Sequence, residues 1–350
     1  MSSALLLVLL SANAPPCYEW YDVRIPKELF VVEEFSRGQV GLAVHEDGQR
    51  VAVVTTRGAL LVDRRKNQKQ PIRRSRFSLS EVVDVAFLDE KRLVFTTSSE
   101  IVQISFVDGR ILKRVKSPPL FYDFAVLKSG YLVGPVEPDG QPFPAHALVS
   151  PEDGKVLFDF GDEAGMRSVM ARDRWGIRFA TGCVTGGILV GDPSTRSLRY
   201  VVRSTGGNPV YAACFDPTGR YLAISWGYCE AAVVDLLGPT VSDAAKASGY
   251  LGKFGQAWRG STDAPTGMGC IDEDWLWFAG GRDLYFCSWR DRKVIAGIGP
   301  YAKADCFVWK GSLDGHLLVA IDYLGTVWFG RLCKEERTDT SAAASKDGIN

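Results

Sequence analysis

The residues of this sequence best suited to chemistry are clustered cations. The segment Arg64–Arg76 holds seven basic residues in thirteen and no acidic residue. Clustered guanidinium and ammonium groups neutralise phosphates, so the segment could bind RNA or an anionic phosphoinositide lipid, and it is also typical of a nuclear-import signal. The candidate anion-binding residues are Arg64, Arg65, Lys66, Lys69, Arg73, Arg74, Arg76, Lys113 and Arg114.

The same cations also have a purely structural interpretation. Lys and Arg on an outer strand protect that sheet edge from pairing with another chain. Two later segments that we predict as outer strands are basic as well: Arg110, Lys113, Arg114 and Lys116, and then Arg196, Arg199 and Arg203. This recurrence favours edge protection, although Arg110–Lys116 belongs to the neighbouring unit and could merge with Arg64–Arg76 into one patch.

A second group of residues suits contact with another protein. Trp258 and Arg259 stand in a polar segment rich in Gly and Ser, and Trp and Arg dominate the hot spots of protein interfaces. The Pro-rich segment Gly134–His146 is predicted as a long loop, the kind of segment that often carries function. We therefore predict a protein-binding site formed by Trp258, Arg259, His146 and Phe143, with local packing as the alternative for Trp258.

The sequence gives no positive sign of catalysis. Its three His residues, His45, His146 and His316, are scattered, and none has a Cys, Asp or second His at metal-ligand spacing. No nucleophile elbow, P-loop or Rossmann fingerprint is present. We predict no enzyme, metal or cofactor; the alternative is an enzyme whose carboxylates or metal ligands converge from several repeats at the mouth of a central channel.

The stretch Val210–Leu237 shows the element that must position these residues. It predicts strands at Val210–Phe215, Tyr221–Ser225 and Ala231–Leu236, with a tight turn at Asp216–Gly219 where Pro fixes one φ and Gly tolerates a positive one. Units of about 40 residues built in this way recur along the chain. Their first strands are predicted to begin at Val40, Val82, Phe121, Ser168, Val210, Gly267 and Asp305.

Repeats of about 40 residues with short strands and Gly-containing turns are typical of a β-propeller. We predict an all-β fold, a β-propeller of seven blades, with eight or six blades as alternatives. The last unit lacks its outer strand, and an open ring would expose two sheet edges, so strands from both termini should close the ring. The N-terminal candidates for this closure are Glu28–Phe35 and Tyr18–Ile25.

The stretch Val210–Leu237 also resembles a WD40-type propeller blade. In that family a strand, a Pro-x-Gly turn, a second strand and a strand ending near Trp-Asp follow in order. Here Val234-Asp235 stands in the Trp-Asp place, and the Gly-His signature of the family is missing. By analogy of fold, the resemblance implies a platform for protein interactions.

Composition limits the remaining choices. The chain has 350 residues, 46% of them hydrophobic, with 36 Gly and no net charge, which describes a turn-rich globular protein without a global pull toward nucleic acid or membrane. We predict one domain over residues 1–333 and a disordered tail over 334–350. Eight Cys without a C-x-x-C motif indicate buried reduced thiols.

The N-terminal segment Ala4–Ala12 bears on the compartment. It is as apolar as the core of a signal peptide, but no Lys or Arg precedes it and Pro15 follows the cleavage-like site. We favour a buried strand, and about ten residues are too few to span a bilayer. A cytoplasmic protein without a transmembrane segment is expected, with a nuclear location as one alternative and secretion as another if residues 1–14 are a signal peptide.

These observations favour a non-catalytic scaffold, a platform subunit of a multiprotein assembly. Its partners would be proteins, whereas nucleic acid or anionic lipid is the less favoured ligand. A channel-mouth enzyme and anion binding through residues 64–76 stay as the alternative functions.

Overall fold

The computed structural model describes most of the chain between residues 18 and 332. The described residues are 18–26, 28–29, 40–64, 73–79, 81–119, 121, 124–137, 145–161, 166–183, 186–203, 209–226, 230–242, 246–247, 249–253, 267–272, 274–280, 283–296, 306–312, 315–322 and 324–332. The predictions for residues 1–14, for Arg65, Lys66, Lys69, Phe143, Trp258 and Arg259, and for the tail 334–350 fall outside them.

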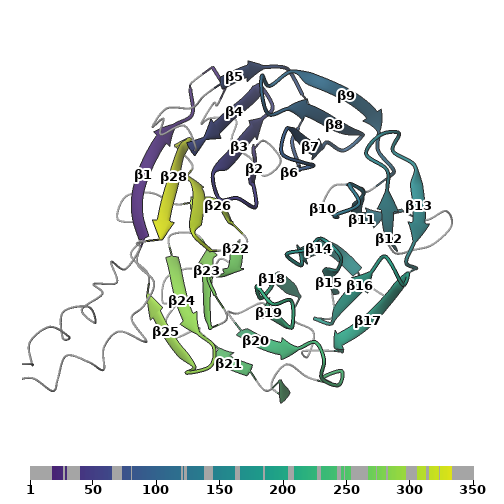
Figure 1. Ribbon diagram of the computed structural model, residues 1–350, viewed down its shortest axis with the longest axis vertical. Helices are drawn as coiled ribbons and strands as arrows, with labels where there is room; N and C mark the ends of the chain where they lie inside the picture. The colour runs from purple at the N-terminus through teal and green to yellow at the C-terminus, as the bar shows by residue number, and fades with distance from the viewer. Residues whose placement is uncertain are drawn as a thin grey trace, which may run out of the picture.

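The described strands form seven four-stranded antiparallel sheets arranged as blades in a ring (Figure 1), which confirms the predicted seven-bladed all-β propeller. Blades one to three contain β2 (Val40–Val44), β3 (Arg50–Thr55), β4 (Gly58–Asp63) and β5 (Arg73–Arg76); β6 (Asp84–Phe87), β7 (Arg92–Thr96), β8 (Glu100–Ser105) and β9 (Ile111–Lys116); and β10 (Ala125–Val126), β11 (Leu132–Val136), β12 (Ala145–Val149) and β13 (Val156–Asp159).

Blades four to seven follow in the same pattern. They contain β14 (Met166–Arg172), β15 (Phe179–Cys183), β16 (Ile188–Asp192) and β17 (Ser197–Val202); β18 (Val210–Phe215), β19 (Tyr221–Trp226), β20 (Glu230–Asp235) and β21 (Gly249–Lys253); β22 (Gly267–Cys270), β23 (Trp275–Gly280), β24 (Asp283–Ser288) and β25 (Lys293–Ala296); and β26 (Cys306–Gly311), β27 (Leu317–Asp322), β28 (Thr326–Leu332) and β1 (Tyr18–Arg24).

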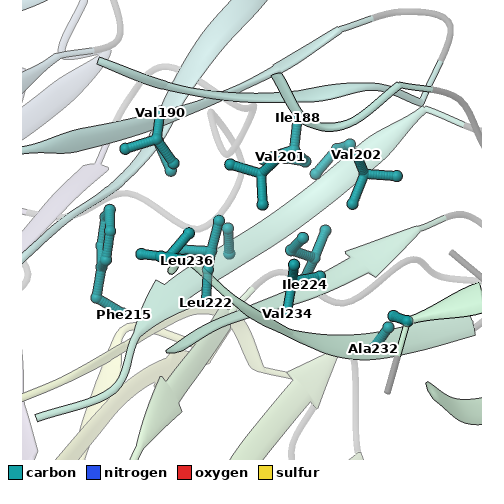
Figure 2. Packing of buried hydrophobic residues seen from close by; sticks show 14 of the residues in the cluster. Ile188, Val190, Val201, Val202, Phe215, Leu222, Ile224, Ala232, Val234 and Leu236 are labelled. Atoms are coloured by element: carbon teal, nitrogen blue, oxygen red, sulfur yellow. The ribbon is translucent and has the colours of Figure 1, made fainter. Parts of the chain in front are cut away.

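The hydrophobic core is divided among the blade interfaces. Each of the seven contacts between neighbouring blades holds its own cluster of buried apolar side chains. In β20, Ala232 and Val234 pack toward blade four, whereas Ala231 and Val233 pack toward blade six, because successive side chains of a strand point to opposite faces. Figure 2 shows the cluster between blades four and five. Both faces of a blade are therefore buried, which explains the nearly continuous apolar runs in the sequence.

The turn between the first and second strands of a blade is stabilised by a recurring side chain. In blade four, Asp173 is 1% exposed, and its Oδ1 accepts hydrogen bonds from the backbone N–H groups of Ile177 at 2.8 Å and Arg178 at 3.2 Å. The corresponding acceptors in other blades are Asp47, Asp89, Asp216, Asp272 and Ser312. These side chains satisfy backbone donors at the start of the second strand, so the turns are rigid.

Two predicted segments are shorter or more regular than expected. The segment Gly238–Asp263, predicted as a long loop or a poorly patterned outer strand, contains the outer strand β21. The Pro-rich segment Gly134–His146 is predicted to be one long loop, but its first residues belong to β11 and its last two belong to β12. Pro135 of β11 lies opposite His146 of β12. Pro135 is accommodated because β11 pairs with β10 only at Leu132 and Val133, so no bond of that ladder depends on its missing N–H.

The ring is closed by pairing between the two ends of the chain. β1 pairs with β28 in an antiparallel register that runs from Tyr18 opposite Leu332 to Arg24 opposite Thr326, and purple β1 lies beside yellow β28 in Figure 1. The prediction that Tyr18–Ile25 closes the ring is confirmed. The other candidate, Glu28–Phe35, has Glu28 and Leu29 in a turn, and its remaining residues are not described.

The side chains of β1 also connect blade seven to blade six. The Tyr18 hydroxyl donates a hydrogen bond to the carbonyl of Gly315 at 2.6 Å, and the Tyr18 ring stacks on Phe286 of β24 with centroids 5.5 Å apart. Trp20 covers Gly330, where a Cβ atom would lie 2.7 Å from the Trp20 ring. Glycine is required there because a larger residue would displace Trp20.

Removal of β1 should open the ring. A chain lacking residues 1–24 should unfold at least about 5 °C below the full chain, because β28 becomes an unpaired edge and aromatic burial is lost. A chain lacking residues 1–16 keeps β1 and serves as the control. Thermal unfolding followed by circular dichroism measures both, and equal midpoints for the two truncated chains would contradict this closure.

Candidate interaction surface

The strand order assigns every connection to one of two faces of the ring. Because the strands of each sheet are antiparallel and consecutive, successive connections alternate between the faces. One face carries the turns between the first and second strands and between the third and fourth strands of each blade, and we call it the first-turn face. The other carries the second-to-third connections and the passages between blades, and we call it the crossover face.

This assignment separates the two groups of predicted binding residues. Phe143 lies between β11 and β12, and Trp258 and Arg259 lie between β21 and β22, so the strands that flank them end at the crossover face. Arg65, Lys66 and Lys69 lie between β4 and β5 in the sequence, and the ends of those two strands that flank them are at the first-turn face. The predicted protein-binding and anion-binding segments therefore start from opposite faces.

Several of the predicted anion-binding cations already have partners. The Lys113 ammonium lies 2.9 Å from the Glu152 carboxylate, and the Arg114 guanidinium lies 3.2 Å from Glu100. The hydrogen bond from Lys113 lowers the pKa of Glu152 below its ordinary value. Arg64 stacks over the Tyr21 ring at 5.3 Å. Paired cations are less available to phosphates than free ones.

The remaining described cations lie on the outer strand β5, which contains Arg73, Arg74 and Arg76. Arg76 is exposed. β5 is held against blade two by a hydrogen bond of 2.6 Å from the Ser75 hydroxyl to the Gly109 carbonyl. β5 and β9 are the outer strands of neighbouring blades, a position that agrees with edge protection, whereas one merged anion-binding patch stays a prediction.

His146 is placed where a direct contact with a partner is excluded by burial. The side chain is fully buried between blades three and four, with Nε2 at 2.9 Å from Oγ1 of Thr181 and the ring stacked near Phe179. Burial lowers the pKa of His146 to about 4. The prediction of a surface role for His146 does not fit this position; the Pro-rich sequence suggested exposure, but β12 already begins at Ala145.

The His146 environment predicts a pH dependence of stability. The unfolded chain binds a proton at His146 near pH 6.5, whereas the folded protein does so only near pH 4, so stability present above pH 6.5 is lost as the pH falls between these values. The loss should reach about 3 kcal/mol.

Urea unfolding of the wild type and of His146→Gln at pH 7 and pH 4.5 measures this effect. The variant lacks the titrating group, so its stability should fall less than that of the wild type over this interval. An equal fall in both proteins would show that His146 does not titrate in this way.

An ion pair on the first-turn face joins two distant blades. Arg172, at the end of β14 in blade four, donates to the carboxylate of Glu46, in the first turn of blade one. Blades one and four lie on opposite sides of the ring (Figure 1). Beside this pair, the buried Arg50 guanidinium bonds to Asp47 at 2.9 Å and contacts His45 at 3.0 Å.

Asp84, at the start of the inner strand β6, is a further ionisable group with a shifted pKa. Burial raises the pKa of Asp84, and the nearby charge of Lys310 on β26 opposes this effect. Its carboxylate accepts hydrogen bonds from the N–H groups of Val85 and Phe124. Within the described ranges, no group of three or more His, Cys, Asp or Glu side chains is arranged to hold a metal ion.

Among the described residues of the first-turn face, the most exposed aromatic side chains lie on blades three and four. Trp175 is 45% exposed, Ile177 is 44% exposed, and Tyr131 is 39% exposed. Their turns touch, since the Lys128 N–H donates to the Gly176 carbonyl at 2.9 Å. Lys128 and Arg174 are exposed beside them. We call Tyr131, Trp175, Ile177, Lys128 and Arg174 the Trp175 surface.

The edge of Trp175 is fixed by the next blade. A Cβ on Gly219 would lie 2.6 Å from the Trp175 ring, so the indole rests directly on the first turn of blade five. Arg178 donates to the Gly219 carbonyl at 2.6 Å and to Asp173 at 3.0 Å, joining the same two turns. The sequence signal for this exposed ring is a Trp that stands outside the alternation of a strand, beside the turn glycine Gly176.

No protein-family model and no curated protein matches this chain. The seven-bladed propeller is thus shown by its strand pairing, and the likeness of Val210–Leu237 to a WD40-type blade stays a resemblance in strand and turn order. In the described chain, no helix is long and apolar enough to cross a membrane.

Proposed function

We propose that the protein is a non-catalytic interaction platform that binds a partner protein through the Trp175 surface. A propeller ring is consistent with such a scaffold, although the fold by itself does not define a function. The observation that carries the proposal is Trp175, whose side chain is 45% exposed although Asp173 holds its turn and Gly219 of blade five supports its ring. Trp and Tyr are enriched among the residues that dominate interface energies.

The rigidity of the surface supports this role. Asp173 holds the backbone of the turn that carries Trp175 and Ile177, and Gly219 supports the indole from blade five. A side chain that is already fixed loses little conformational entropy on binding, so more of its contact energy contributes to affinity. A Trp side chain offers a large apolar ring together with one N–H donor, which suits a contact surface.

The charges on the surface indicate the kind of partner. Lys128 and Arg174 are exposed cations next to an apolar centre, whereas the nearby Asp173 carboxylate is buried and bonded to Arg178. A partner segment with acidic residues beside an apolar anchor would complement both features. The partner would belong to a multiprotein assembly in which this chain is a scaffold subunit, in the cytoplasm or the nucleus.

The crossover face offers a second contact region for the same function. Phe143, Trp258 and Arg259 are predicted anchors there, on connections that start from that face. A ring with binding residues on both faces could join two partners, which is the property of a scaffold. The variant Trp258→Ala tests this second region in the same binding experiment as the Trp175 surface.

Loss of Trp175 should remove the partner. The tagged protein is purified from its native host with and without nuclease, its partner is identified by mass spectrometry, and affinity is then measured with the two purified proteins. Trp175→Ala should weaken binding by at least about 30-fold, which corresponds to a hot-spot contribution of about 2 kcal/mol.

Two matched variants sharpen this test. Leu112→Ala removes a 49% exposed side chain from the outer strand β9, away from both proposed regions, and should leave affinity unchanged, whereas Trp258→Ala reports on the second region. A partner that binds Trp175→Ala as tightly as the wild type would reject the Trp175 surface. A partner lost with nuclease and with Arg76→Glu would replace the platform with anion binding.

A further inference from the structure

Two buried thiols lie against each other between blades five and six. Sγ of Cys214 on β18 and Sγ of Cys270 on β22 are 3.4 Å apart. Both are free thiols, 9% and 6% exposed. β18 and β22 are the innermost strands of their blades and are in contact. The two Cys are 56 residues apart in sequence, and the contact between blades five and six brings them together.

We propose that Cys214 and Cys270 are a covalent modification site, at which a peroxide oxidises the two thiols to a reversible disulfide that links blades five and six. A disulfide requires sulfur atoms about 2 Å apart, so the bond forms after an approach of about 1.4 Å from the present contact. This displacement is small enough to be shared between two side chains without a change of strand pairing.

The position of the thiols gives a small oxidant a short route. Cys214 and Cys270 are each two residues before a first-turn aspartate, Asp216 and Asp272, so both lie at the first-turn end of their strands. Hydrogen peroxide is small and uncharged, which suits an apolar surrounding.

The reaction balances with one peroxide for each disulfide. The thiolate of one Cys attacks a peroxide oxygen, the O–O bond breaks, and the released hydroxide leaves as water after taking up a proton, which yields a sulfenic acid. The second thiol attacks that sulfur, the S–O bond breaks, and hydroxide again leaves as water with the proton of the second thiol. Two thiols are oxidised, and the peroxide is reduced to two waters.

The surroundings make the reaction slow at neutral pH and faster in base. The hydrogen bond with Cys214, together with burial, holds the pKa of the Cys270 thiol well above its ordinary value. Since the thiolate is the nucleophile, the oxidation rate should rise with pH. Cys287, a third buried thiol of the same cluster, provides a comparison, because burial raises its pKa to about 12.

A thiol-mapping experiment tests the proposal. The folded full-length protein is treated with hydrogen peroxide, free thiols are blocked with iodoacetamide, and peptides are analysed by mass spectrometry without reduction. We expect a linked pair of peptides that contain Cys214 and Cys270, which dithiothreitol separates. The oxidised protein should unfold about 5 °C above the reduced protein, because the link constrains the unfolded chain.

Controls distinguish this disulfide from general oxidation. Cys287→Ser should form the same link, whereas Cys214→Ser and Cys270→Ala should form none and gain no thermal stability in peroxide. If one of these variants does not fold, the other provides the same test. The proposal is overturned if Cys214 and Cys270 remain alkylatable while other thiols oxidise, or if they link mainly to other cysteines.

Discussion

The pairing of β1 with β28 is the interaction on which the rest of this structure depends. A blade whose two faces are buried still has sheet edges with unpaired backbone N–H and C=O groups. A ring of such blades is stable only when neighbouring blades cover one another all the way round. The N-terminal strand supplies the outer edge of blade seven, and Tyr18 extends the contact to Phe286 in blade six. Residues separated by most of the chain thus hold every blade interface in place.

Closure also explains why the first-turn face can present fixed side chains. In six of the seven blades the first turn is held by an Asp or Ser side chain. In blades one and four an Arg at the start of the second strand, or one residue before it, reaches the first turn of the next blade. The Arg172–Glu46 pair adds a contact across the ring. Trp175 is presented by this connected set of turns, which is a physical reason to regard it as a preformed contact and not as a mobile loop residue.

Much of the fold follows from local sequence, because each blade is built from contacts close in the chain. Asp216–Gly219 predicts its turn, and the apolar runs on either side predict β18 and β19. The choice of Tyr18–Ile25 over Glu28–Phe35 as the closing strand required the ring itself, since it depends on the distant partner β28. Trp20 over Gly330 is the kind of pair that specifies such a register, and neither residue identifies the other in the sequence.

The candidate sites were less predictable, because they form where blades meet. His146 follows a Pro-rich segment that suggests exposure, yet it is buried against Thr181 of the next blade. Cys214 and Cys270 have no motif spacing, and only the contact of β18 with β22 brings them together. Sequence periodicity predicts which residues are buried within a blade, but it carries little information about which residue of the neighbouring blade they meet.

Native-state hydrogen exchange of β1 tests the closure most directly. If β1 completes the ring, the N–H groups of Tyr18–Arg24 that bond to β28 should exchange as slowly as those joining β27 and β28, and both sets should become exposed in the same unfolding event. Rapid exchange of β1 while β27 and β28 stay protected would contradict the account, because the ring would then be stable without its N-terminal strand.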